Sequence, residues 1–384
     1  MSLARNLDFL RHLPKVDGLR LPDFSRGADA LSPLEEVTDF GDNPGALRMF
    51  AFVPEQLQKP RALVVVLHGC GQTAAGYDLG AGWSTLARHY GFALVMPEQQ
   101  RANNGNTCFN WFNPEDTARD SGEARSIREM VAHMVEAHRI DPKRIFITGL
   151  SAGGGMTSVM LATYPEVFAA GAIIAGLPYG IASNLREALD GMFHSPVRPE
   201  RELGDFVRRA SNHRGPWPKV SVWHGSADRT VNPGNANEIV KQWLDLHDLP
   251  AAPMAETKVD GYPRQAWWNK DGETLVESYA ITDMAHGTPL GLADNDQRYG
   301  AEGAFLIEAG ISSSYHIAKF FGLTGWIPDA KKAETKPVRS AAPHLARSIR
   351  TSVAEPAEPK REESRGFDLG QIITRALTAA GLMK

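Results

Sequence analysis

The segment over residues 145–165 constrains the fold of this chain more than any other part of the sequence. A short run of β-branched and aromatic residues over 145–148 leads directly into Gly149-Leu150-Ser151-Ala152-Gly153, a G-x-S-x-G box. A stretch without Gly or Pro follows over 156–164, and Pro165 marks where a helix would end. Strand, sharp turn and helix in this order mount a nucleophilic serine hydroxyl at the edge of a sheet. The glycines two residues before and after Ser151 remove Cβ atoms that would clash in so tight a turn.

Strand-like and helix-like segments alternate over residues 45–325. Strands are expected over 45–54, 61–67, 92–96, 144–148, 167–175, 220–223 and 276–281, and Pro97 is expected to end the third. Helical patterns cover 83–90, 121–138 and 156–164, and Ser121 is the expected capping residue of the second. This alternation predicts an α/β fold, in which a mostly parallel, doubly wound sheet carries helices on both faces.

Composition excludes several classes of protein. The chain has 384 residues, 42% hydrophobic and 22% charged, and its net charge of −4 gives no reason to expect nucleic-acid binding. No apolar stretch reaches the ~20 residues of a membrane span. The first residues lack the apolar core of a signal peptide, so the N-terminus alone predicts a cytoplasmic protein. The two cysteines do not have metal-ligand spacing, their default in the cytosol is two thiols, and we expect neither metal nor cofactor.

The composition also divides the chain into segments. Residues 1–35 are interpreted as an N-terminal extension and residues 36–328 as the catalytic domain. Within this domain, residues 178–218 contain five prolines and are a candidate lid or cap insertion. Residues 329–365 are rich in small and charged residues, which predicts a disordered linker. Residues 366–384 have the pattern of an amphipathic helix that docks on the chain's own domain or on a partner.

A serine nucleophile needs a histidine base and a carboxylate that orients it, and in this kind of fold the acid and then the base follow the serine along the chain. Asp228 follows the strand-like segment that ends in His224-Gly225, and His286 follows the strand-like segment 276–281. These positions make Asp228 the predicted acid and His286 the predicted base. Asp283 is the alternative acid, and His224 is interpreted as a histidine that packs within its loop.

The tetrahedral intermediate of acyl transfer carries an oxyanion that two backbone N–H groups usually stabilise. The residue after the nucleophile, Ala152, supplies one N–H at the start of the following helix. The loop after the strand-like segment 61–67 is the expected source of the other, and Cys70 is the predicted donor. Because a backbone group would do this work, the thiol of Cys70 is not needed for the chemistry.

Four motifs in order carry a family resemblance: His68-Gly-Cys-Gly-Gln-Thr, Pro97-Glu-Gln-Gln, Cys108-Phe-Asn-Trp-Phe112 and Gly149-Leu-Ser-Ala-Gly-Gly-Gly-Met156. Residues 40–325 resemble esterases of the poly(3-hydroxybutyrate) depolymerase type, which are related to feruloyl and acetylxylan esterases. The resemblance implies an α/β-hydrolase fold, a Ser151, Asp228 and His286 triad, and an oxyanion hole made by Cys70 and Ala152.

The chain also departs from the pattern of this family. Many members are secreted to the extracellular region, whereas this N-terminus does not look like a signal peptide. The tail is too short for the substrate-binding domain that secreted polymer degraders often carry, and Ile181 stands where many members have a cysteine. These departures concern where a polymer would be degraded more than whether an ester is hydrolysed.

Aromatic residues near the second cysteine are candidates for substrate binding. If Cys108 lies near Cys70, which would allow a disulfide, Trp111 and Phe112 come close to the cleft, where an aromatic wall suits apolar acyl chains. Ordinary core packing of these rings is the alternative. Trp267 is a further candidate for the cleft wall.

These features together predict a serine carboxylic-ester hydrolase that works through an acyl-enzyme. The expected substrates are poly- or oligo-(3-hydroxybutyrate) and other short-chain hydroxyalkanoate esters. A feruloyl or acetylxylan esterase is the alternative enzyme. A noncatalytic granule- or polymer-binding protein is the alternative from another class, and the complete Ser, Asp and His set argues against it.

Overall fold

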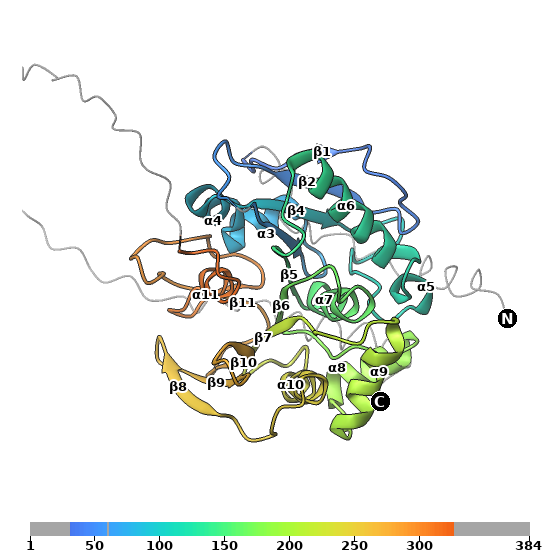
Figure 1. Ribbon diagram of the computed structural model, residues 1–384, viewed down its shortest axis with the longest axis vertical. Helices are drawn as coiled ribbons and strands as arrows, with labels where there is room; N and C mark the ends of the chain where they lie inside the picture. The colour runs from blue at the N-terminus through green and yellow to red at the C-terminus, as the bar shows by residue number, and fades with distance from the viewer. Residues whose placement is uncertain (1–30, 60, 326–384) are drawn as a thin grey trace, which may run out of the picture. The chain divides into compact units, whose positions relative to one another are not determined.

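A ten-stranded sheet forms the centre of the computed structural model, which describes residues 31–59 and 61–325 (Figure 1). The strand order is β1-β2-β4-β3-β5-β6-β7-β10-β9-β8. These strands are β1 (Glu35–Val37), β2 (Arg48–Phe52), β3 (Leu63–Leu67), β4 (Ala93–Glu98), β5 (Ile145–Leu150), β6 (Ala170–Ile174), β7 (Lys219–Gly225), β8 (Ala255–Val259), β9 (Tyr262–Trp268) and β10 (Thr274–Ile281). A two-stranded sheet pairs β11 (Thr288–Leu290) with β12 (Leu306–Glu308).

Six neighbouring strands, β4, β3, β5, β6, β7 and β10, run parallel to one another. Antiparallel strands flank this block, with β2 and β1 on one side and β9 and β8 on the other. Every residue of β3, β4, β5 and β6 is buried, which explains why their sequences are mostly apolar. The predicted mostly parallel α/β sheet is confirmed.

Helices cover both faces of the sheet (Figure 1). Because side chains alternate along a strand, Val65 and Leu67 of β3 face one hydrophobic cluster, and Val64 and Val66 face the other. The first cluster includes residues of α6, α7 and α10, and the second includes residues of α3, α4 and α11. The helices are α3 (Ala74–Ala81), α4 (Trp83–Tyr90), α5 (Pro114–Thr117), α6 (Gly122–His138), α7 (Ala152–Thr163), α8 (Leu185–His194), α9 (Glu200–Ala210), α10 (Gly234–His247) and α11 (Ser313–Phe320).

The structure corrects three local predictions. Helix α3 was not expected from its glycine-containing sequence; the Thr73 hydroxyl caps it by accepting the Gly76 N–H. Strand β4 continues through Pro97, because its pairing with β3 ends at Val95 and β3 therefore needs no N–H from the proline. Ser121 precedes α6 but makes no side-chain cap, since its hydroxyl donates to the carbonyl of Glu115 instead.

The segment over residues 178–218 contains α8 and α9, and α9 contacts α10 and α7. Its role as a lid stays a prediction. Residues 1–30 of the predicted extension, the linker 329–365 and the helix over 366–384 lie outside the described residues. None of the helices in the described part of the chain combines the length and apolarity that a bilayer crossing requires.

The turn from β5 into α7 is built around two glycines. A Cβ atom on Gly149 would lie 2.3 Å from the carbonyl oxygen of Gly153. A Cβ atom on Gly153 would lie 2.4 Å from the carbonyl oxygen of Leu67 and 2.5 Å from that of His68. Real Cβ atoms do not approach backbone oxygens so closely, so only glycine lets α7 begin directly against the end of β3.

The Gly153→Ala variant tests this packing. The new methyl group must push α7 away from β3, and we expect a loss of about 3 kcal/mol in the free energy of unfolding. Gly105→Ala is the matched control, because a Cβ atom there meets nothing within 4 Å. Urea denaturation of both variants gives the measurement, and a Gly153→Ala protein as stable as the control would contradict the packing described.

Candidate active site

Ser151 occupies a strained position between β5 and α7. Its backbone has φ 57° and ψ −116°, a conformation that costs a non-glycine residue roughly 1–3 kcal/mol. Its N–H donates to the carbonyl of Ile174 at 2.9 Å, which fixes the turn to the end of β6. Ser151 is partly exposed, whereas all residues of β5 and α7 are buried. The fold therefore presents one serine side chain at an otherwise closed turn.

Asp228 and His286 follow two adjacent parallel strands, and both loops start at the same edge of the sheet. Strand β7 pairs with β10 so that Gly225 lies opposite Ile281, and the N–H of Ser226 donates to the Ile281 carbonyl. This register brings the two loops together, and His286 Nδ1 lies 2.7 Å from Asp228 Oδ2. The predicted acid and base therefore form a hydrogen-bonded pair.

The strand ends also connect this pair to the serine. The Ser151 N–H binds Ile174 of β6, and the Ala175 N–H in turn donates to Trp223 of β7 at 2.8 Å. Since β5, β6, β7 and β10 are neighbours and parallel, Ser151, Asp228 and His286 all follow strands at one edge of the sheet. This is the edge at which open α/β sheets place their ligand sites.

The carboxylate of Asp228 is buried and ionised. Burial opposes its charge, but hydrogen bonds from His224 and His286 and their attraction to the carboxylate outweigh that cost. The net effect holds the pKa of Asp228 well below its usual range. The backbone N–H groups of Thr230 and Val231 donate to Oδ1 at 2.8 and 2.9 Å. The acid can therefore attract the proton on His286 Nδ1 while staying unprotonated itself.

Two sequence-based interpretations of this region are wrong. Asp283, the alternative acid, is exposed and its N–H donates to Ser226 Oγ, whereas the side chain bound to His286 is that of Asp228. His224 does more than pack within its loop, because its Nε2 lies 3.1 Å from Asp228 Oδ2. The short turn after β7 brings the aspartate back to the histidine four residues earlier.

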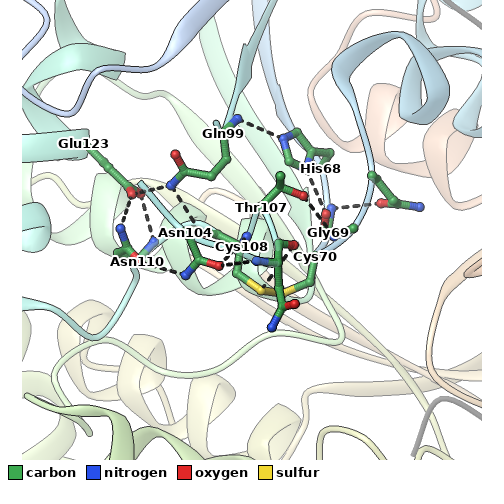
Figure 2. The surroundings of a disulfide bond; sticks show 12 residues. His68, Gly69, Cys70, Gln99, Asn104, Thr107, Cys108, Asn110 and Glu123 are labelled. Carbon is green, nitrogen blue, oxygen red and sulfur yellow. Dashed lines mark hydrogen bonds between the residues drawn. A yellow bond between two sulfur atoms is a disulfide. The ribbon is translucent and has the colours of Figure 1, made fainter. Parts of the chain in front are cut away.

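A disulfide and several hydrogen bonds hold the loop after β3, which carries the predicted donor Cys70 (Figure 2). Cys70 and Cys108 form a disulfide that ties this loop to the segment after β4. The Gly69 N–H donates to Gln72 Oε1 at 2.9 Å, and the Gly71 N–H donates to the Asn106 carbonyl at 2.8 Å. Between them, the Cys70 N–H has no acceptor among the described residues. The predicted donor is thus the N–H that the loop leaves available.

His68 holds the peptide group to which this N–H belongs. The N–H of Gln99 donates to His68 Nε2 at 3.1 Å, so the proton of the neutral ring lies on Nδ1 and is donated to the Gly69 carbonyl at 2.8 Å. Because C=O and N–H point in opposite directions across a trans peptide, this bond directs the Cys70 N–H away from His68. Sequence reasoning assigned His68 no role, since a histidine at a strand end gives no sign of its tautomer.

The buried carboxyl group of Glu123 holds Gln99 and so supports this arrangement (Figure 2). The side-chain amide of Gln99 donates to Glu123 Oε1 at 2.5 Å and to the Cys108 carbonyl at 3.1 Å. Glu123 also accepts hydrogen bonds from the backbone and side chain of Asn110. Burial, helped by the charge of Asp116, raises the pKa of Glu123 to about 8 against these bonds. Hydrogen bonds thus link Glu123 of α6 to the segment that carries Cys108 and, through Gln99 and His68, to the loop that carries Cys70.

The three candidate substrate-binding aromatics lie in different surroundings. Trp111 is 9% exposed and packs on α7, where a Cβ atom on Gly155 would lie 2.7 Å from its ring. Phe112 is half-buried and meets Trp111 edge to face, with 5.4 Å between ring centres. Trp267 is only 2% exposed on β9, and its indole N–H donates to the Ala252 carbonyl. We therefore correct the placement of Trp267 from cleft wall to core.

His68 makes the stability of the fold depend on pH. Burial lowers the pKa of His68 from 6.5 to about 4. The unfolded chain therefore takes up a proton at this position below about pH 6.5, while the folded chain stays neutral until about pH 4, so stability falls as the pH drops through this window. The difference corresponds to about 3 kcal/mol. We expect urea denaturation at pH 7 and pH 4 to show a correspondingly smaller acid loss for His68→Gln than for the wild type. Equal losses in the two proteins would refute the buried neutral histidine.

Comparison with known proteins gives the family. The model of the family described as esterase PHB depolymerase matches residues 50–260. Poly(3-hydroxyalkanoate) depolymerase C of Paucimonas lemoignei is 45% identical over 293 residues, which cover 76% of this chain and 70% of that protein. An acetylxylan esterase of Coprinopsis cinerea is 33% identical over 263 residues, covering 67% of this chain and 69% of that protein.

A solved structure agrees with these sequence matches. The acetyl xylan esterase from Aspergillus awamori superposes with a TM-score of 0.63 and 25% sequence identity, over 76% of this chain and all of that chain. The fold is therefore that of an α/β-hydrolase. The chain belongs to the esterase PHB depolymerase family and is a carboxylic ester hydrolase.

Proposed function

We propose that the chain hydrolyses poly- or oligo-(3-hydroxyalkanoate) esters through an acyl-enzyme on Ser151. The observation that carries the catalytic part is the buried Asp228–His286 pair, which lies at the sheet edge where the strained turn presents Ser151. The substrate class rests on the 45% identity to a poly(3-hydroxyalkanoate) depolymerase over most of both chains.

In the first half of the reaction, Ser151 Oγ attacks the ester carbonyl and His286 accepts the hydroxyl proton. Asp228 stabilises the imidazolium through the 2.7 Å bond to Nδ1. The oxyanion that forms accepts hydrogen bonds from the N–H groups of Cys70 and Ala152, and the second of these lies at the positive end of α7. His286 then gives its proton to the departing alkoxide, and the acyl group remains on Ser151.

In the second half, a water molecule replaces the alcohol. His286 removes a proton from this water as it attacks the acyl carbonyl, and the same two N–H groups stabilise the second oxyanion. Collapse of the intermediate breaks the bond to Ser151 Oγ, which regains its proton from His286. The products are a carboxylic acid and an alcohol, and no cofactor enters the balance.

Acetylxylan-type esters are the second candidate substrate, because the acetylxylan esterase of Coprinopsis cinerea resembles this chain in sequence and that of Aspergillus awamori resembles it in structure. Trp111 and Phe112 pack as a pair beside α7 and are the residues we propose for contact with the acyl chain. The Cys70–Cys108 disulfide favours an oxidising compartment over the cytoplasm that the N-terminus suggested.

Replacing Ser151 with alanine removes the nucleophile. We expect hydrolysis of p-nitrophenyl butyrate to fall by about 10⁴-fold or more, because the rest of the triad cannot act without it. Ser211→Ala, at the end of α9, is the control and should keep the wild-type rate. Equal rates for Ser151→Ala and the control would disprove the triad.

The substrate class is tested separately with the wild-type protein. Hydroxybutyrate oligomers, acetylated xylan and methyl ferulate are compared at equal ester concentration, with released acid as the readout. We expect the oligomers to be hydrolysed fastest. Activity on acetylated xylan or methyl ferulate alone would overturn the proposed substrate and leave the catalytic assignment intact.

A further inference from the structure

A second histidine contacts the proposed catalytic aspartate. His224 is the penultimate residue of β7 and is 3% exposed. Its Nε2 lies 3.1 Å from Asp228 Oδ2 and 3.0 Å from the carbonyl oxygen of Val231. Both neighbours are hydrogen-bond acceptors, so Nε2 carries a proton and donates it to this pair of oxygens.

The other ring nitrogen of His224 points to no partner. Among the described residues, Nδ1 is a buried atom without a hydrogen bond. A buried polar atom without a partner is costly in a folded protein. The hydrogen bonds of the His224 ring are those made through Nε2.

Four donors from the described part of the chain surround the carboxylate of Asp228, and the two oxygens receive them from different sources. Oδ1 accepts the backbone N–H groups of Thr230 and Val231. Within residues 31–59 and 61–325, Oδ2 accepts only from imidazoles, with His286 Nδ1 at 2.7 Å and His224 Nε2 at 3.1 Å. The oxygen that orients the proposed base is thus held in place by a second histidine and not by the backbone.

We propose that His224 is a positioning residue for ester hydrolysis, whose Nε2–H fixes Oδ2 of Asp228 in the place from which it orients His286. This inference rests on the proposed roles of Asp228 and His286. Without the second donor, the carboxylate is anchored by the backbone at Oδ1 alone and can turn about its last side-chain bond. The donor also makes Oδ2 less basic, which keeps the proton on His286 Nδ1 when the imidazolium forms.

The surroundings of His224 allow this role to be separated from simple packing. His224 lines a cavity of about 370 Å³ together with Ser226, Ala236, Tyr279 and two charged residues, Glu256 and Arg264. The guanidinium of Arg264 is already paired with Glu277. A small molecule that enters this cavity can reach the place of the imidazole ring once the side chain is removed.

Three variants distinguish the contributions. His224→Gln keeps an N–H donor near the position of Nε2, His224→Leu fills a similar volume without a donor, and His224→Ala opens the cavity. With p-nitrophenyl butyrate, we expect kcat of the Leu variant to fall at least about tenfold with KM little changed, and the Gln variant to keep most of the wild-type kcat. Added imidazole should restore activity to the Ala variant in a saturable way and should not restore Ser151→Ala.

The pH profile supplies a second readout. With Oδ2 no longer held, the carboxylate of Asp228 turns away from His286 and stabilises the imidazolium less, so the acid limb of kcat/KM should shift to lower pH in the Leu variant and stay in place in the Gln variant. If His224 acted by filling space alone, the Leu variant would keep the wild-type pH profile.

The outcomes are separable from those of the triad itself. A Leu variant with wild-type kcat and pH profile would overturn the inference, as would a Gln variant as impaired as the Leu variant together with an Ala variant that imidazole does not rescue. If Asp228→Asn leaves hydrolysis unchanged, the proposed function fails instead. If the Leu variant does not fold, the Gln and Ala variants still decide between these results.

Discussion

The close contact between the start of α7 and the end of β3 is the constraint on which the rest of the site depends. Gly153 has no side chain, so the first turn of α7 lies against the carbonyl groups of Leu67 and His68. In the sheet, Leu67 of β3 is paired with Gly149 of β5. The strained serine and the loop that carries the Cys70 N–H therefore leave adjacent strands at the same level. The serine and this loop lie close together because Leu67 pairs with Gly149 and because Gly153 has no Cβ atom.

Two histidines fix the polar geometry around this contact, each in a single tautomer. His68 accepts from a backbone N–H and donates to Gly69, which directs the neighbouring peptide N–H outwards. His224 donates to the oxygen of Asp228 that also binds His286. In both cases the imidazole is buried and holds a group to which we assign a part in the proposed reaction. In that proposal, these dipoles are already in place before the reaction begins.

Much of this arrangement could be predicted from the sequence, and the limits have physical causes. The buried parallel strands are long apolar runs, and Ser151, Asp228 and His286 follow such runs in the chain order that the fold requires, so their positions were predictable. The periodicity of a sequence does not predict which neighbours an individual side chain contacts. Trp267 was therefore expected at the cleft although it points into the core, and His224 was expected to pack within its loop although it binds Asp228. Helix α3 was missed because capping by Thr73 and burial, and not its glycine-containing sequence, stabilise it.

Covalent capture tests the proposed nucleophile, Ser151, most directly. Diethyl p-nitrophenyl phosphate phosphorylates an activated serine and releases one equivalent of p-nitrophenolate. If Ser151 is the nucleophile, we expect one equivalent released per chain, loss of esterase activity in parallel, and the added mass on the peptide that contains Ser151. Labelling of a different residue with the same loss of activity, or full activity without any labelling, would contradict the assignment of Ser151 as the nucleophile.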